Sequence, residues 1–368
     1  MFNKDRIRIA KDLRGYSNAD FAEKLNCSLS KVKQLLDVSK DISETDQIHI
    51  AHILELPFSF FLEDFNHPHQ TEQIFYRSVA RIKAQHRKTN EAYTLLAKNI
   101  NQYFMAKLKL PEFKKPDFGI TEPRDQYNYI ENLAISLRST WGLGIQPINN
   151  MVSLCELKGI RVFRLPLQVK EIDALSFFDD ESGSPFIFLN TTKSAERVRF
   201  DCAHELGHTV MHTHNKYIKD EVDNRFLEIE ADKFASEFLM PTEGFLSTAP
   251  SYLTIENMIE YKKVWRTSLK AINYKSHKLN RISDWVYRSN SMKINSLGYH
   301  LNEPNETHRD ESVMLPKLMM TLASDPKFSK QQMLDEIGIS EKDFNELTFD
   351  ALSKFEESKP KPKLYLVQ

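Results

Sequence analysis

Two histidines and a glutamate stand at a spacing that suits metal chemistry: His204, Glu205 and His208 form the pattern His-Glu-x-x-His. If this stretch is helical, the imidazoles project from one face, one turn apart, and can bind the same ion. Zinc held by three protein ligands keeps a position for water, which ionises near neutral pH. Glu205 lies about 100° round the helix and can pass the proton of that water to a leaving amine. The pattern predicts metal-assisted hydrolysis; the alternative is a helix that carries these residues by chance.

The elements around this pattern can be predicted from periodicity. A mostly apolar stripe predicts that the histidine-bearing stretch is a buried helix. Before it, residues 160–165, 174–178 and 185–190 have strand patterns, and 179–184 suit a hairpin turn. We expect a small antiparallel sheet that leads into the metal-binding helix. An exposed edge of that sheet could hold an extended peptide, although the sequence does not say which strand forms the edge.

A third ligand is needed, and three residues are candidates. His214 follows closely, but ligation by it requires a bend at Met211, where a glycine would be needed. Glu228 and Asp232 share one face of a later predicted helix, so Glu228 can ligate while Asp232 accepts the ring N–H of a ligand histidine. Glu230 lies on a different face of that helix. We favour Glu228 and keep Glu230 and His214 as alternatives.

The sequence around these residues resembles that of a known protein family. The blocks 197–208, 228–235 and 239–241 together resemble the ImmA/IrrE metallopeptidase family, over about 148–285. Its members are minimal gluzincin-like zinc peptidases known for cleaving helix-turn-helix repressors. The resemblance implies Zn²⁺ as cofactor and a repressor-like protein substrate. It also implies roles for five residues: His204, His208 and Glu228 as ligands, Glu205 as base, and Asp232 as the partner of a ligand histidine.

Three further residues near this region have weaker indications. Residues 265–274 resemble the small helical element that follows the site in this family. Tyr274 or His277 could donate to the oxyanion of a tetrahedral intermediate; the alternative is a packed tyrosine and a surface histidine. His212 continues the histidine stripe, but two turns put it about 12 Å from His204, too far to share the ion. We interpret His212 as structural.

The N-terminal part, from residue 6 to about 65, reads as five short helices. Residues 17–25 and 28–36 have helix-turn-helix spacing, each opened by a serine cap. The order of residues 14–28 resembles the XRE (lambda-repressor-like) family, which implies a homodimeric regulator that binds operator DNA. The DNA-contacting residues would be Asn18, Ser28, Ser30, Lys31, Lys33 and Gln34.

The charge of this region does not favour DNA. The first 66 residues hold nine Lys/Arg and eleven Asp/Glu, whereas a DNA-binding unit normally has a basic face. A fold kept for dimerisation or for protein binding is the alternative. Residues 76–88 carry five basic residues and no acid, and could supply phosphate contacts or form a solvated helix face.

The whole chain sets the remaining expectations. Its 368 residues carry 50 Lys+Arg and 51 Asp+Glu, which gives no global bias toward nucleic acid or membrane. Three scattered cysteines indicate a reducing compartment, and no apolar run suits a membrane span or signal peptide, so we expect a cytoplasmic protein. We predict a mostly α, α+β fold: a helix-turn-helix domain at 1–66, a helical connector at 67–140, a metallopeptidase domain with zincin-like helices at 141–290 and a small helical domain at 291–368.

Overall fold

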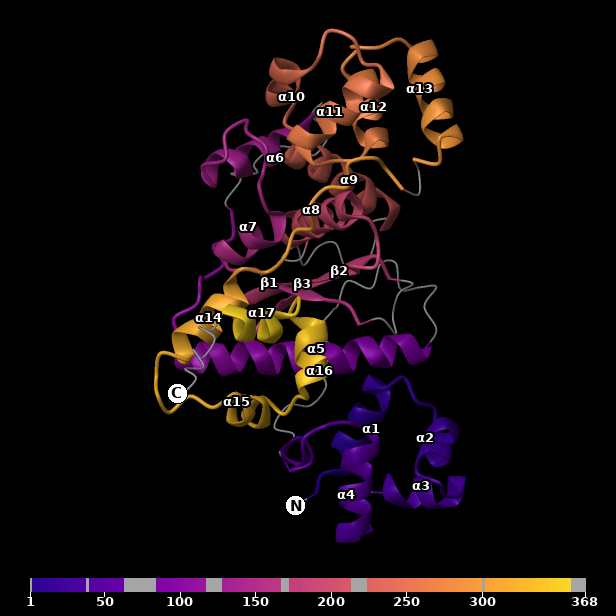
Figure 1. Ribbon diagram of the computed structural model, residues 1–368, viewed down its shortest axis with the longest axis vertical. Helices are drawn as coiled ribbons and strands as arrows, with labels where there is room; N and C mark the ends of the chain where they lie inside the picture. Colours follow the sequence, from indigo (N-terminus) through magenta and orange to yellow (C-terminus); the bar gives the residue numbers. More distant parts are fainter. Residues whose placement is uncertain are drawn as a thin grey trace, which may run out of the picture.

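A computed structural model of the chain describes residues 2–37, 40–62, 84–116, 128–166, 172–212, 224–299 and 302–358. Within these ranges the fold is α+β and mostly helical, with 17 α-helices and one three-stranded sheet. The elements stack along the long axis (Figure 1). N-terminal helices occupy one end, the long helix α5 (Ala84–Lys107) crosses the middle, and the sheet follows. Beyond it lie α8 (Ala195–Met211) and α9 (Asn224–Leu239).

The N-terminal end contains four α-helices and one 3-10 helix, where five short helices were expected. They are α1 (Lys4–Leu13), α2 (Asn18–Lys24), α3 (Leu29–Leu35), α4 (Glu44–Ile53) and η1 (Phe58–Phe61). Ser17 and Ser28 accept hydrogen bonds from backbone N–H groups in the first turns of α2 and α3. These bonds satisfy donors that a helix start leaves unpaired, and so fix where both helices begin.

The sheet is mixed, so the expectation of an antiparallel sheet was wrong. Strands β1 (Arg161–Arg164), β2 (Ala174–Asp179) and β3 (Ser184–Leu189) lie in the order β1-β3-β2. The hairpin β2–β3 is antiparallel as predicted, but β1 pairs with β3 in parallel. β3 is buried along its whole length, and its residues 185–189 are apolar, which is typical of a central strand with a partner on each side. The hairpin places β2 on one side of β3, and β1 takes the other side in parallel.

The two faces of the sheet contact different cores. Phe186 and Phe188 of β3 belong to the core formed with α5, the N-terminal helices and the C-terminal helices. Ile187 and Leu189 belong to the core formed with α6 (Tyr129–Thr140), α7 (Met151–Leu157), α8 and α9. Because successive side chains of a strand point to opposite faces of the sheet, β3 contributes to both cores.

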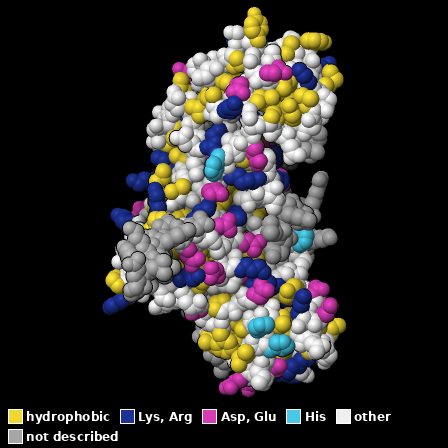
Figure 2. Space-filling view, in the orientation of Figure 1, with side chains coloured by type: hydrophobic (Ala, Val, Ile, Leu, Met, Phe, Trp, Pro, Cys, Tyr) yellow, Lys and Arg dark blue, Asp and Glu magenta, His cyan; other side chains and the backbone are white. Residues whose placement is uncertain are grey.

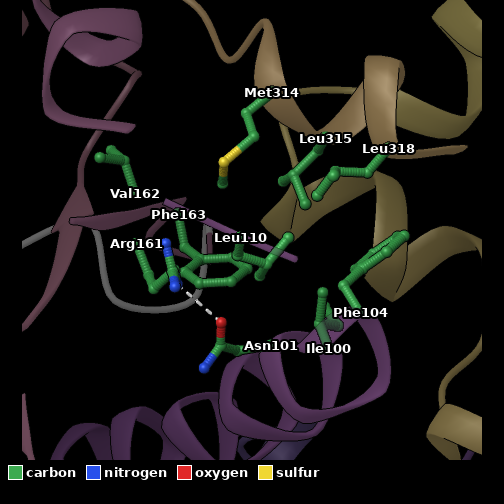
Figure 3. A pocket seen from close by; sticks show the side chains of 10 residues that line it. All are labelled: Ile100, Asn101, Phe104, Leu110, Arg161, Val162, Phe163, Met314, Leu315 and Leu318. Atoms are coloured by element: carbon green, nitrogen blue, oxygen red, sulfur yellow. Dashed lines mark hydrogen bonds between the residues drawn. The ribbon is translucent and has the colours of Figure 1, made fainter. Parts of the chain in front are cut away.

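The C-terminal helices α14 (Met314–Leu322), α15 (Lys330–Ile337), α16 (Glu341–Leu347) and α17 (Ala351–Ser358) pack back onto α5 and β1. Figure 3 shows Leu315 and Leu318 of α14 beside Phe104 of α5. In the same place Arg161 of β1 donates from Nε to Asn101 Oδ1 over 2.7 Å. These helices share one core with the N-terminal end.

The opposite end is built from α10 (Thr242–Thr248), α11 (Ile255–Trp265), α12 (Leu269–Lys278) and α13 (Asp284–Ser296) around a separate small core. Figure 2 shows hydrophobic side chains gathered over this end. Tyr252, Trp285 and Met292, which belong to this part of the chain, are exposed. None of the helices in the described ranges has the length and apolarity needed to cross a bilayer.

Candidate metal centre

Helix α8 carries the His-Glu-x-x-His pattern through the centre of the molecule. Ser194 caps its first turn, and most of its residues are buried between the sheet and α9. Gly207 lies where α9 comes closest: a Cβ there would sit 3.0 Å from Phe234 Cδ1 and 3.4 Å from Ala231 Cα. A glycine at this point therefore allows α9 to approach the two histidines closely.

Three side chains from α8 and α9 converge at one point. His204 Nε2 lies 3.0 Å from His208 Nε2 and 3.1 Å from Glu228 Oε2. His208 Nε2 lies 3.4 Å from Glu228 Oε1. The two imidazole nitrogens and the carboxylate are within 4.8 Å of one another, a spacing at which they could hold one metal ion. Among the three candidates for a third ligand, the structure brings Glu228 to the histidines.

The donor atoms that meet at this point suit a cation. Asp232 Oδ1 lies 2.9 Å from His204 Nδ1, and a carboxylate only accepts, so His204 donates its Nδ1–H. Once Nε2 is deprotonated, its lone pair points toward Glu228 and toward His208 Nε2. Two imidazole nitrogens and a carboxylate together form a set of acceptors that suits zinc or a similar divalent ion.

Burial and charge set the protonation of these groups. Burial lowers the pKa of His208 to about 4, which keeps the ring neutral and able to ligate. Burial alone would raise the pKa of Glu228, but hydrogen bonds with both histidines hold it well below its usual range. Burial would lower the pKa of His204, yet Asp232 and Glu228 raise it to about 10. An ion at this point would displace that proton, because metal ligands must be deprotonated.

Glu205 lies next to this cluster on the side of the sheet. Its side chain is buried, and Ser176 of β2 donates from Oγ to Glu205 Oε2 over 2.5 Å. Ser176 faces α8 because it pairs with Ile187, whose side chain lies in the core beside α8. Burial raises the pKa of Glu205 to about 7, although the nearby His204 and the bond from Ser176 act to lower it. A carboxylate with a pKa near neutrality can both accept and return a proton.

His212, interpreted from the sequence as structural, contacts one member of the cluster, His208. Its side chain is fully buried, its Nδ1 lies 2.8 Å from His208 Nδ1, and its Nε2 lies 3.0 Å from Glu230 Oε2. Glu230 is thus placed against His212 and not among the three converging side chains. The repeat of histidine at four-residue intervals, 204, 208 and 212, is the sequence signal for this contact.

The remaining candidates of this region are placed as follows. His214 lies outside the described residues. Tyr274 of α12 is 49% exposed, with the Lys278 ammonium over its ring. His277 Nε2 is 2.5 Å from Asp284 Oδ1, and its ring stacks on Tyr287. None of these contacts reaches the histidine cluster, and the oxyanion role of Tyr274 stays a prediction.

The predicted DNA-contacting residues lie on α2, α3 and the turn before α3. Five of them, Asn18, Ser28, Ser30, Lys33 and Gln34, are exposed, and the Ser28 hydroxyl also caps α3. Lys31 donates to Asp46 Oδ2 of α4 over 2.8 Å, so one of the two lysines is paired with an acid. The basic run at 76–88 lies mostly outside the described residues; at its end, Arg87 pairs with Glu91 over 3.6 Å.

Comparison with known proteins bears on the central part of the chain. A search of curated proteins found no match. A family model does match about a third of the sequence, and that part includes β1–β3, α8 and α9 with the whole histidine–carboxylate cluster. The match indicates a metallopeptidase-like function for this segment. Residues 155–277 match Peptidase_M78, the IrrE N-terminal-like domain.

Proposed function

We propose that the protein is a zinc-dependent endopeptidase of the gluzincin type. The observation that carries the proposal is the convergence of His204 Nε2, His208 Nε2 and the Glu228 carboxylate at one point beside a buried Glu205. Two imidazoles and one carboxylate are the ligand set of catalytic zinc in several peptidases. When bound, zinc would supply a Lewis acid that lowers the pKa of water and polarises a carbonyl group.

The chain's own residues would handle the proton. Ser176 donates to Glu205 Oε2, and the Glu205 carboxylate would accept a proton from the reacting water. Glu205 would then return that proton to the amine that leaves when the peptide bond breaks. Its pKa of about 7 suits both steps near neutral pH. Asp232 would hold the His204 ring in the tautomer that presents Nε2.

The substrate would be an extended segment of another protein. β2 is an outer strand of the sheet, and its residue Ser176 touches Glu205. A peptide added alongside β2 would therefore place its backbone next to the proton-transferring carboxylate. The resemblance to the ImmA/IrrE family supports a helix-turn-helix repressor as the substrate, and hence a regulatory role in the cytoplasm.

The test is proteolysis by matched variants. Zinc-loaded protein is incubated with a peptide library, and new termini are read by mass spectrometry. Glu205→Gln should retain zinc and lose cleavage, whereas Glu243→Gln, the same change at an exposed site on α10, should cleave as wild type does. Equal cleavage by Glu205→Gln and wild type would remove Glu205 from the mechanism. Partners trapped by Glu205→Gln from cell extract would identify the substrate.

DNA binding is a second candidate function, and the exposed polar face of α3 favours it. Ser30, Lys33 and Gln34 project from this helix, which follows α2 after a short turn. In this alternative the protein would be a repressor or antitoxin that binds operator DNA as a homodimer, and its metal site would be sensory or structural and would not cleave peptides. Binding of genomic DNA fragments that is lost in Lys33→Glu and unaffected by a chelator would support it. Absence of binding at low salt would exclude it.

A further inference from the structure

Behind His208, a second histidine and a carboxylate form a chain of hydrogen bonds. His208 Nδ1 lies 2.8 Å from His212 Nδ1, and His212 Nε2 lies 3.0 Å from Glu230 Oε2. The His208 and His212 side chains are 5% and 0% exposed, and that of Glu230 is 21% exposed. This chain lies on the side of the His208 ring that faces away from Glu228.

The chemistry of the groups fixes the direction of each bond. If His208 ligates through Nε2, its neutral ring carries the proton on Nδ1 and donates it to His212 Nδ1. His212 must then be the tautomer protonated at Nε2, and this N–H donates to the Glu230 carboxylate. The reverse direction would require Glu230 to donate, and an ionised carboxylate cannot.

We propose that His212 and Glu230 are positioning residues that hold His208 in the tautomer and orientation needed to bind the ion. The inference rests on the proposed metal site and adds two residues to it. It also explains how α9 supports two ligands differently. Asp232 contacts His204 directly, at 2.9 Å, whereas Glu230 contacts His208 only through His212. Groups that orient ligand histidines in this way typically change metal affinity by about 10- to 100-fold.

Glu230 acts in this proposal without touching the ion. Its neighbour Glu228 supplies the carboxylate of the cluster, and residues two apart on a helix point about 200° apart. The Glu230 carboxylate is instead bonded to His212, one turn beyond His208. A role through His212 predicts that removing His212 makes the identity of residue 230 unimportant, whereas direct ligation predicts an independent loss.

The experiment measures zinc affinity by competition with a chromophoric chelator, on folded protein at fixed pH. His212→Leu should bind zinc about 10- to 100-fold more weakly than wild type. His212→Gln should keep most of the affinity, because an amide oxygen can accept from His208 while the amide N–H donates to Glu230. Glu230→Ala should weaken binding, and the double variant Glu230→Ala/His212→Leu should bind as His212→Leu does.

The outcomes separate this proposal from the one it rests on. Failure of wild type to bind zinc would overturn the metal site itself. Wild-type affinity in folded Glu230→Ala would overturn the positioning role alone. Equal losses in His212→Leu and His212→Gln would also overturn it, as would additive losses in the double variant. Thermal unfolding of the metal-free variants reports their packing separately, and if His212→Leu does not fold, Glu230→Ala decides.

Discussion

Replacing Ser176 by alanine should raise the pKa of Glu205. Ser176 is fully buried on β2, and its hydroxyl donates to Glu205 Oε2 over 2.5 Å. A hydrogen bond to a charged group contributes about 1.5–3 kcal/mol. It stabilises the ionised carboxylate, so its loss favours the protonated form. At about 1.4 kcal/mol per pH unit, the pKa of Glu205 should rise by about 1 to 2 pH units in Ser176→Ala.

The assay is a carbon-13 NMR titration of metal-free protein labelled at the glutamate carboxyl carbons. The Glu205 resonance is identified by its absence in Glu205→Gln. The control is Ser184→Ala on the neighbouring strand β3, where the hydroxyl is equally buried but donates to the Ser182 carbonyl. In that variant the pKa of Glu205 should stay at its wild-type value. An unchanged or lowered pKa in Ser176→Ala would refute the reasoning.

Three more predictions concern stability and packing. Burial raises the pKa of Glu205 from 4.5 to about 7, so the metal-free wild-type protein loses stability as the pH rises through that interval. At pH 8, urea unfolding should show Glu205→Gln to be about 3 kcal/mol more stable than wild type. Near pH 4 this difference should vanish. Asp343→Ala leaves the Arg14 guanidinium buried without its bidentate partner and should lower the free energy of unfolding by about 3–5 kcal/mol. Lys342→Ala removes an exposed ion pair and should lower it by less than about 1 kcal/mol. Equal losses in the two variants would contradict this prediction. Gly207→Val should push α9 away from α8 and weaken zinc binding in the chelator assay, and unchanged affinity would show that the close approach is unnecessary.

The convergence of the histidines with Glu228 followed from local patterns. Residues four apart on a helix share a face, so the residue types showed which side chains of α8 and of α9 lie together. Pro241 showed where α9 ends. The position of Glu228 four residues before Asp232 favoured it over Glu230 and His214, and the resemblance implied the same residue. The role of Glu228 as a zinc ligand stays a prediction until metal is measured.

The sheet order and the C-terminal packing could not be predicted in this way. An apolar strand pattern shows that a residue such as Ile187 is buried, but not which strand lies beside it. Likewise, the apolar face of α16 gave no sign that its Asp343 would pair with Arg14, which follows the last residue of α1. Both results depend on contacts between residues far apart in the sequence. The contact between His212 and His208 was not predicted either, because from the sequence we considered only whether His212 could reach the ion.

The measurement that tests the central claim most directly is X-ray absorption at the zinc edge of purified, zinc-loaded protein. The account predicts one zinc per chain with two imidazole nitrogens and at least one carboxylate oxygen at about 2.0–2.2 Å. In His208→Ala one imidazole should disappear from the spectrum. A spectrum without imidazole, or one unchanged in His208→Ala, would contradict a metal centre at His204, His208 and Glu228.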